Sequence, residues 1–579
     1  MALRLRRLVE QCVPCELEEA SITRAHSRII TPAVVQAAQE AGSEEYRSCV
    51  VFCLLVVKRW FRRQGVIELW DAELHRVRAI ACDVIAKAII EQEADLGYLL
   101  HDVLLRRYSI LVDGEPTHAS NVIERAVDLH ALRVICSSGY QKCISYLWRG
   151  WLVQDEDDPA VFVDYRDRDN RSIWVHLDPD RMRTPMYQNV AMMLVSFVYL
   201  GLYTVCINTI NPSGSFDAAE VLLYLFTLGF VCDELTKFWK AGYHIFGFWN
   251  AFHGTMYAFL TASFVLRVLG LSHGDVDDPM RVHWNKLSYT LLAFAAPMFW
   301  GRLLLYLDTI RFFGAMLVVV KVMMKESLIF FALLAIIAVG FVQAFIGMDI
   351  ADDNMADDLS FIIRSMTNSV LQSPEFSGFS NFSPPFGIIL YYCFTFIVMV
   401  VLLNVLIALY NSAYQDIYDN AEDEFLALFA HKTMQFIRAP DENVYVAPLN
   451  LVEMVLIVTL EWWMPKRQYE LVNDVVMAIA YSPLLLVAAY AETKSAAEIL
   501  QNRMRGQGDD DTVEEWEQLE GEVDFEADGW DKTCQSVAAN VEEDAAVVEV
   551  RRLRGEVEEL RELVARRLPQ RGEEQWRAS

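Results

Sequence analysis

Carboxylates are concentrated in one stretch of the chain, Met348–Pro385, which lies between two strongly apolar runs. It holds six acidic residues and a single basic one, Arg364. Within it, Leu359–Leu371 carries apolar residues at helical spacing and could descend as a short helix. Rings of carboxylates or carbonyls, repeated by symmetry, replace the hydration shell of a cation and repel anions. We therefore expect a cation-selective constriction at the next four residues, the alternative being a solvated acidic loop. These residues are Gln372, Ser373, Pro374 and Glu375.

Two other groups of side-chain oxygens could bind calcium, which prefers six to eight oxygen ligands. Asp233, Glu234 and Asn250 lie on neighbouring helices, and solvation of the helix ends explains them equally well. Asp509, Asp510 and Asp511 are adjacent, so their charges repel one another and a bound divalent cation would relieve the repulsion. A solubilising acidic linker is the alternative for this triad.

A gate is expected where a helix lines the pore with apolar side chains, because an apolar ring excludes water. Leu403, Ile407 and Asn411 lie four residues apart and therefore share one helix face. We expect this face to close the pore.

These residues must be positioned by membrane helices. The chain is 54% apolar with a mean hydropathy of +0.22, yet its formal charge is −28. A bilayer core needs roughly twenty mainly apolar residues per helix. The expected spans are Met186–Ile207, Ala219–Trp239, Phe246–Leu269, Leu287–Leu307, Ser327–Phe345 and Phe386–Tyr410. Four spans followed by two that bracket a re-entrant segment are typical of voltage-gated-like channels. We expect an all-α membrane protein of this six-span fold.

The domain boundaries follow from shifts in composition. We expect a helical cytosolic domain at 1–180, a four-helix membrane domain at 186–310, a linker helix at 311–326 and a pore domain at 327–412. Post-pore helices should occupy 413–505, an acidic disordered linker 506–545 and a coiled coil 546–568, whose seam is Val550, Leu553, Val557, Leu560 and Val564. Trp148–Tyr165 is strand-like.

The post-pore runs Pro448–Trp463 and Leu471–Tyr490 could add two spans, but their polar residues favour interfacial helices. Basic residues cluster beside the spans on one side, which places both termini in the cytosol. They are Arg181, Arg183, Lys237, Lys240, Arg311, Lys321 and Lys325. Arg302 is the one basic residue of the fourth span, so strong voltage gating is not expected. The acidic chain argues against nucleic-acid binding.

Four segments carry a resemblance to a known family. The run Leu402–Asn411 resembles the LLNxLIA signature of transient receptor potential channels. Asn450–Glu453, Glu461–Pro465 and Tyr481–Val487 are similar to the post-pore region of the fungal vacuolar members of that family. The resemblance covers roughly residues 180–510. A filter glycine common in related pores is absent, since Gln372 precedes Ser373.

The resemblance implies a homotetramer in the vacuolar membrane that releases calcium through a poorly selective cation pore. It also implies activation by cytosolic calcium and membrane stretch, with inhibition by phosphatidylinositol 3-phosphate and lumenal calcium. The triad Asp509–Asp511 matches the family's cytosolic acidic cluster, and the lumenal inhibitory acids would map to Asp352, Asp353 and Asp357.

Two other classes of protein are considered. An eight-span secondary transporter would show repeated halves and helices broken at mid-membrane, and no such symmetry is found. An enzyme would carry a catalytic motif, yet HExxH, GxxxxGK and GxSxG are absent.

Overall fold

The computed structural model describes residues 1–24, 27–112, 115–155, 158, 160–209, 215–241, 248–274, 278–353, 359–380, 383–418, 420–438, 445–454, 464–512, 529–537, 550, 553–554, 556–557 and 560–561. The chain divides into two compact units. The first comprises Met1–Cys143, Gln154–His176 and Ala489–Ser579, and the second comprises Ile144–Val153 and Leu177–Ala488.

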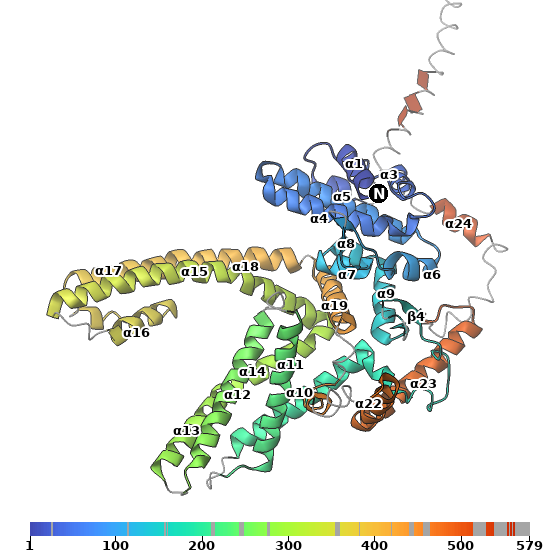
Figure 1. Ribbon diagram of the computed structural model, residues 1–579. Coiled ribbons are helices and arrows are strands. Elements are labelled where there is room, and N and C mark those ends of the chain that lie inside the picture. Colours follow the sequence, from blue (N-terminus) through green and yellow to red (C-terminus); the bar gives the residue numbers. More distant parts are fainter. Residues whose placement is uncertain are drawn as a thin grey trace, which may run out of the picture. The chain divides into compact units, whose positions relative to one another are not determined.

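The amino-terminal part is mainly helical (Figure 1). Its α-helices are α1 (Ala2–Cys12), α2 (Glu19–Thr23), α3 (Pro32–Glu40), α4 (Val50–Ile67), α5 (Ala72–Gln92), α6 (Leu96–Tyr98), α7 (Val122–Asp128), α8 (Leu132–Ile135) and α9 (Ser138–Arg149). Single turns and short helices of other pitch are η1 (Arg47–Cys49), η2 (Leu69–Asp71), η3 (Leu99–Leu104) and η4 (Pro179–Arg183). The strands are β1 (Leu111–Val112), β2 (Glu115–Pro116), β3 (Leu152–Gln154) and β4 (Phe162–Asp164).

The helices α4 and α5 form the core of the first unit. Apolar residues at three- and four-residue spacing, such as Leu54 and Phe61 on α4 and Ile85 on α5, are fully buried. A buried ion pair joins the two helices, with 2.5 Å between Lys58 Nζ and Asp83 Oδ2. The stretch Arg76–Gln92, whose apolar residues recur at helical spacing, forms most of α5. The strand structure predicted for 148–165 is confirmed only in part, because α9 continues to Arg149 and β4 covers only three residues.

The second unit contains the membrane helices and the helices that follow them. They are α10 (Pro185–Asn208), α11 (Ala218–Ala241), α12 (Phe248–Ser272), α13 (Pro279–Phe294), α14 (Ala296–Arg302), η6 (Leu303–Thr309), α15 (Arg311–Asp353), α16 (Leu359–Val370), η7 (Gly378–Ser380), α17 (Phe386–Phe396), η8 (Ile397–Leu402), α18 (Leu403–Tyr418), α19 (Ala421–Arg438), α20 (Asn450–Val452), α22 (Lys466–Ala480) and α23 (Ser482–Met504, which continues into the first unit).

Five segments of the described chain are long and apolar enough to cross a membrane: Pro185–Asn208, Trp249–Ser272, Pro279–Asp308, Arg311–Ala351 and Phe386–Ser412. The predicted second span corresponds to α11. With 24 residues, α11 is as long as α10. It is less apolar because it carries Glu220, Asp233, Glu234 and Lys237. The expected linker helix 311–326 and the fifth span form one uninterrupted helix, α15, of 43 residues.

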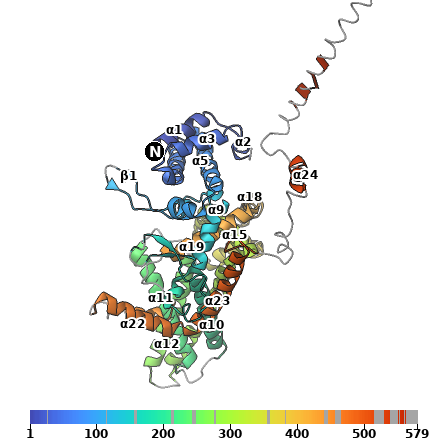
Figure 2. The same cartoon turned by 90° about the vertical axis from the view of Figure 1, so that its right-hand side faces the viewer.

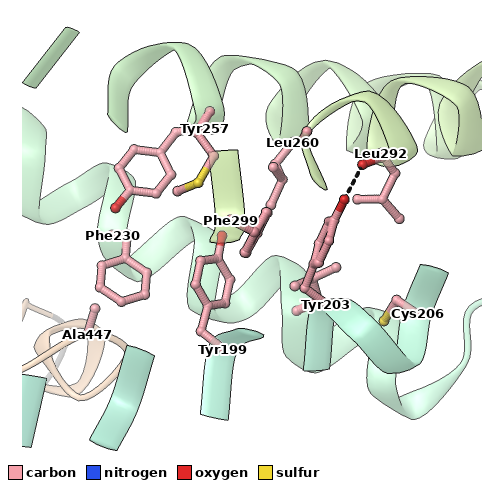
Figure 3. Close-up of a cluster of buried hydrophobic side chains, with 12 residues drawn as sticks. Tyr199, Tyr203, Cys206, Phe230, Tyr257, Leu260, Leu292, Phe299 and Ala447 are labelled. Carbon is pink, nitrogen blue, oxygen red and sulfur yellow. Dashed lines mark hydrogen bonds between the residues drawn. The ribbon is translucent and has the colours of Figure 1, made fainter. Parts of the chain in front are cut away.

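An aromatic core holds the helices α10 to α14 together (Figure 3). The rings of Tyr203 and Phe299 stack with centroids 3.7 Å apart, and the Tyr203 hydroxyl donates to the Leu292 carbonyl oxygen at 2.7 Å. The Tyr199 hydroxyl lies 2.8 Å from Thr227 Oγ1. These contacts satisfy buried hydroxyls while the rings fill the space between helices.

A buried ion pair makes the charged helix α11 compatible with a membrane. Arg267 Nε lies 2.9 Å from Glu220 Oε1, and Arg267 Nη2 donates to Glu220 Oε2 at 3.1 Å. Both side chains are at most 5% exposed. Charges inside a membrane domain are tolerated when they pair in this way.

Breaking this pair is expected to be costly. Arg267→Met leaves the Glu220 carboxylate buried without its cation, which should cost about 3–5 kcal/mol of stability. The thermal midpoint of the detergent-solubilised protein measures this effect. Arg267→Lys should lose less, and Arg267→Met combined with Glu220→Gln should recover much of the loss. Equal midpoints for the single variant and the wild type would contradict the prediction.

The second post-pore run, Leu471–Tyr490, is broken at Tyr481. Leu471–Ala480 of α22 meets α23 at an 88° bend (Figure 2). A straight span over 471–490 is therefore excluded. Taken together, the two bent segments are still long and apolar enough to form one broken span, so the interfacial placement stays a prediction. Of the first run, α20 is described, and its continuation through residues 455–463 lies outside the described residues.

The described part of the acidic tail is not entirely without regular structure. A helix, α24 (Trp530–Val537), lies inside the linker predicted to be disordered. Asp531 in its first turn interacts favourably with the helix dipole, a local effect that composition does not capture. Within the expected coiled coil, Val550, Leu553, Val557 and Leu560 are described and exposed, whereas Val564 lies outside the described residues.

Candidate pore and regulatory sites

The short helix α16 is held between α15 and the helices that follow the filter loop. Its residues Ile362, Ser365, Met366 and Ser369 recur at helical spacing and are buried. They face an apolar cluster that includes Phe345 on α15, Phe394 on α17 and Val398 on η8. Leu359–Leu371 was predicted to descend as a pore helix, and the observed helix Leu359–Val370 confirms that it is helical.

The expected filter begins where α16 ends. The backbone N–H groups of Leu371, Gln372 and Ser373 donate back into the last turn of the helix, at 2.8 to 3.1 Å. Gln372 has φ +63°, a left-handed conformation that a side chain makes costly by about 1 kcal/mol. This is the position where the sequence lacks a glycine. The carboxyl end of α16 carries partial negative charge, so it favours a cation beside the filter.

The carboxylate of Glu375 is exposed in the single chain. Its backbone N–H instead donates to the hydroxyl of Tyr391 on α17, at 3.2 Å. Tyr391 is fully buried and also contacts Ser365 and Ser369 of α16. The sequence carries no signal that points to Tyr391, because only the fold brings residue 391 beside the filter.

The sixth span changes pitch in its middle. A π-helical turn, η8, separates α17 from α18, and the Asn404 amide donates to the Val400 carbonyl oxygen at 2.7 Å. Beyond it, the predicted gate residues lie on α18. Ile407 is 48% exposed, Asn411 is exposed and Leu403 is half-buried. This face is therefore partly uncovered in the single chain.

The helix α19 connects the end of the sixth span to the start of α15. Lys432 Nζ lies 2.5 Å from Asp308 Oδ1 in a largely buried ion pair. Arg311 at the start of α15 also pairs with Glu422 at the start of α19. These ion pairs therefore join α19, which follows the sixth span, to the segment between the fourth and fifth spans.

The stretch Tyr445–Asn450 attaches the post-pore region to the four-helix bundle. Ala447 belongs to the aromatic core of the bundle, and the Asn450 amide donates to the Gly229 carbonyl oxygen on α11 at 2.7 Å. The Val446 N–H donates to the Tyr481 hydroxyl at 2.8 Å. The post-pore helices are thus packed on the bundle, which composition did not predict.

The calcium site predicted on α11 and α12 has its three residues near the facing ends of the two helices. Asp233 and Glu234 lie in the last three turns of α11, and Asn250 lies in the first turn of α12. His253 Nδ1 is 3.9 Å from a Glu234 carboxylate oxygen. No group of three His, Cys, Asp or Glu side chains placed to share a metal ion occurs in the part of the chain that the structure describes. A calcium ion here would need the Asn250 amide or further ligands.

The lumenal acids are described only in part. Asp352 and Asp353 lie in the last turn of α15, and Asp357 lies outside the described residues.

The acidic triad follows α23 and is held by basic side chains. Asp509 accepts hydrogen bonds from Arg503 at 2.6 and 2.9 Å, and its Oδ2 lies 2.7 Å from Arg168 Nη2. Asp510 lies 3.6 Å from Lys142 Nζ, and Asp511 accepts the Gly508 N–H at 2.7 Å. The Arg503 guanidinium holds the pKa of Asp509 below its usual value, so this group is ionised. The premise of a flexible tail with mutually repelling charges is therefore wrong for this segment.

Arg302 of the fourth span is enclosed by aromatic rings. Its guanidinium carbon lies 4.0 Å from the Phe230 ring centroid, and Nη1 donates to the Tyr257 hydroxyl at 3.2 Å. Such cation–π contacts are worth about 2 kcal/mol when desolvated. The single charge of this span is thus enclosed in the bundle core.

Comparison with known proteins gives consistent results over most of the chain. A family model described as Calcium channel YVC1-like, C-terminal, matches residues 195–493, and one described as TRPY1 N-terminal linker helical domain matches residues 1–177. The protein Calcium channel YVC1 of Candida albicans is 40% identical over 547 residues, covering 91% of this chain and 80% of its own length. Calcium channel YVC1 of Saccharomyces cerevisiae is 41% identical over 541 residues, covering 90% and 79%. The solved structure of full-length TRPY1, bound to PI3P and calcium in detergent, has a TM-score of 0.73 at 35% identity, covering 94% of this chain and 98% of that one.

Proposed function

The chain belongs to the YVC1-like family of calcium channels, and we propose that four copies of it form a pore that releases calcium from the vacuole. It is a calcium-permeable cation channel and not an enzyme. The alternative of an eight-span secondary transporter finds no support in the relatives.

The observation that carries this proposal is the filter turn at the carboxyl end of α16. The helix dipole and the Glu375 carboxylate both favour cations at this point, and fourfold repetition would close them into a ring. Apolar residues on the α18 face then supply the gate, with Ile407 at its centre. The pore is expected to be poorly selective because a ring of single carboxylates attracts any hydrated cation.

The regulation is proposed on the family's pattern. Cytosolic calcium and membrane stretch open the pore, and phosphatidylinositol 3-phosphate and lumenal calcium inhibit it. TRPY1 has been solved with PI3P and calcium bound, which supports a regulatory role for both ligands here. The membrane is that of the vacuole, with both termini in the cytosol.

A planar-bilayer recording of the purified protein tests the proposal. Unitary, ohmic current steps that carry calcium and potassium support a channel. Substrate uptake coupled to an ion gradient without such steps would contradict it.

Glu375→Gln should lower calcium permeability relative to potassium. The substitution removes one carboxylate from each of the four proposed subunits. In a watery pore, one unit charge at 4 Å from another contributes about 1 kcal/mol, so each lost carboxylate costs a divalent ion about 1 kcal/mol more than a monovalent one. The relative calcium permeability should therefore fall by at least roughly fivefold. The reversal potential under bi-ionic conditions measures this ratio. Glu375→Asp, which keeps the charge, serves as the control. An unchanged reversal potential in Glu375→Gln would remove Glu375 from the filter.

A further inference from the structure

Tyr391 lies at the point where the filter, the pore helix and the sixth span meet. Its side chain is fully buried on α17. Its hydroxyl contacts three groups from two other segments, the helix α16 and the filter loop. Resting on the filter assigned above, we infer that Tyr391 is the positioning residue that sets the place of Glu375 and thereby the ion selectivity.

The hydrogen-bonding capacity of this hydroxyl is completely used. A tyrosine hydroxyl has one hydrogen to donate and can accept two hydrogen bonds. It donates to the Ser365 carbonyl oxygen at 3.0 Å, and it accepts from Ser369 Oγ at 3.1 Å and from the Glu375 N–H at 3.2 Å. Ser369 Oγ is also 2.9 Å from Thr395 Oγ1, which ties the network back to α17. No other arrangement of this hydroxyl satisfies all three groups.

The filter backbone explains why this contact matters. The N–H groups of Gln372 and Ser373 return to Ser369 and Asn368 of α16. Pro374 has no N–H to donate. Glu375 is therefore the first residue after the helix whose N–H binds a different element, and Tyr391 is its acceptor.

The ring of Tyr391 is fixed by its neighbours, so the hydroxyl has little freedom. It stacks on Phe379 with centroids 4.2 Å apart and an interplanar angle of 15°, and it meets Phe376 edge-on at 5.3 Å. Phe376 follows Glu375 directly in the chain. The loop is thus held on both its backbone and its apolar side by one residue of the sixth span.

Tyr391→Phe tests the inference, because it keeps the ring and removes only the hydroxyl. The expected result is a several-fold change in the calcium-to-potassium permeability ratio, measured from bi-ionic reversal potentials. Activation by cytosolic calcium should remain at the wild-type level, since the gate and the triad are untouched. The matched control is Tyr392→Phe, the next residue, which is exposed and stacks on Phe376 at 4.7 Å. Its permeability ratio should equal that of the wild type.

A double-mutant cycle separates positioning from general weakening of the fold. Combined with Glu375→Gln, Tyr391→Phe should change the ratio less than it does in the wild type, because both act through the same carboxylate. A wild-type ratio in Tyr391→Phe would overturn the inference, while an effect of Glu375→Gln in the same experiment would leave the filter assignment standing. No effect of either variant would overturn both.

Tyr391→Phe could fail to assemble, since it leaves the Glu375 N–H without its acceptor. Ser369→Ala then provides the test, because it removes one of the three hydrogen bonds and leaves the hydroxyl in place. A smaller change of the permeability ratio, with a normal amount of assembled channel by size-exclusion chromatography, supports the inference. A wild-type ratio in Ser369→Ala would count against it.

Discussion

Ile407→Asn is expected to leave the channel open at rest. The side chain lies on α18, below the π-helical turn, and is 48% exposed in the single chain. Four copies of an apolar side chain around the axis would exclude water and stop conduction. A polar amide removes a cost of about 1 kcal/mol or more for wetting each position. Over four subunits this should raise the resting open probability well beyond tenfold.

Single-channel recording without cytosolic calcium or stretch measures this open probability. Val405→Asn is the matched control, because Val405 is 46% exposed but lies about 200° around the helix from Ile407. It should remain closed at rest. Closure of the Ile407→Asn channel with wild-type frequency would place the gate elsewhere.

Changing Asp509, Asp510 and Asp511 together to Asn should abolish the response to cytosolic calcium. The unitary current and the response to stretch should persist, because the triad is far along the chain from the filter and gate residues. Open probability as a function of cytosolic calcium, recorded at constant tension, measures the effect. A wild-type calcium curve would show that the triad serves only as a linker.

The basic partners of Asp509 allow a sharper test of what the triad does. Arg168 and Arg503 already neutralise this carboxylate, so calcium must compete with them to bind. If calcium binds the triad, Arg168→Gln removes a competitor and should shift half-activation to lower calcium concentration. If the ion pairs only fasten α23 to the segment 154–176, Arg168→Gln should instead resemble the triple Asn variant. For Arg168→Gln, the two interpretations therefore predict opposite changes in the response to cytosolic calcium, a gain in one case and a loss in the other.

Arg166→Gln is the natural control for this experiment. It removes the same charge two residues before Arg168, within the same segment. The shift produced by Arg168→Gln must exceed that of the control for the triad to be the competing site. If both variants shift half-activation equally, the effect of Arg168→Gln is explained by the change in local net charge alone.

The sequence by itself determined the membrane architecture. A helix that crosses a bilayer must be about twenty residues long and mainly apolar, so its position is encoded locally. The predicted spans accordingly overlap the observed helices α10 to α15, α17 and α18, and the six-span fold is confirmed by the likeness to TRPY1. Local composition was not sufficient in two places. The charges of α11 are accommodated through an ion pair with a neighbouring helix, and the bend at Tyr481 interrupts an otherwise apolar run.

Only the tertiary structure determined what holds the functional residues in place. Asn450 meets Gly229 across 221 residues of sequence, and Arg503 meets Asp169 across 334. Glu375 meets the Tyr391 hydroxyl only because α16 folds back against α17. Local composition predicted functional roles for the acids at 375 and 509 from their type and spacing. It could not identify Tyr391 or Arg168, since a partner is chosen by the packing of distant segments and leaves no periodic signal in the chain.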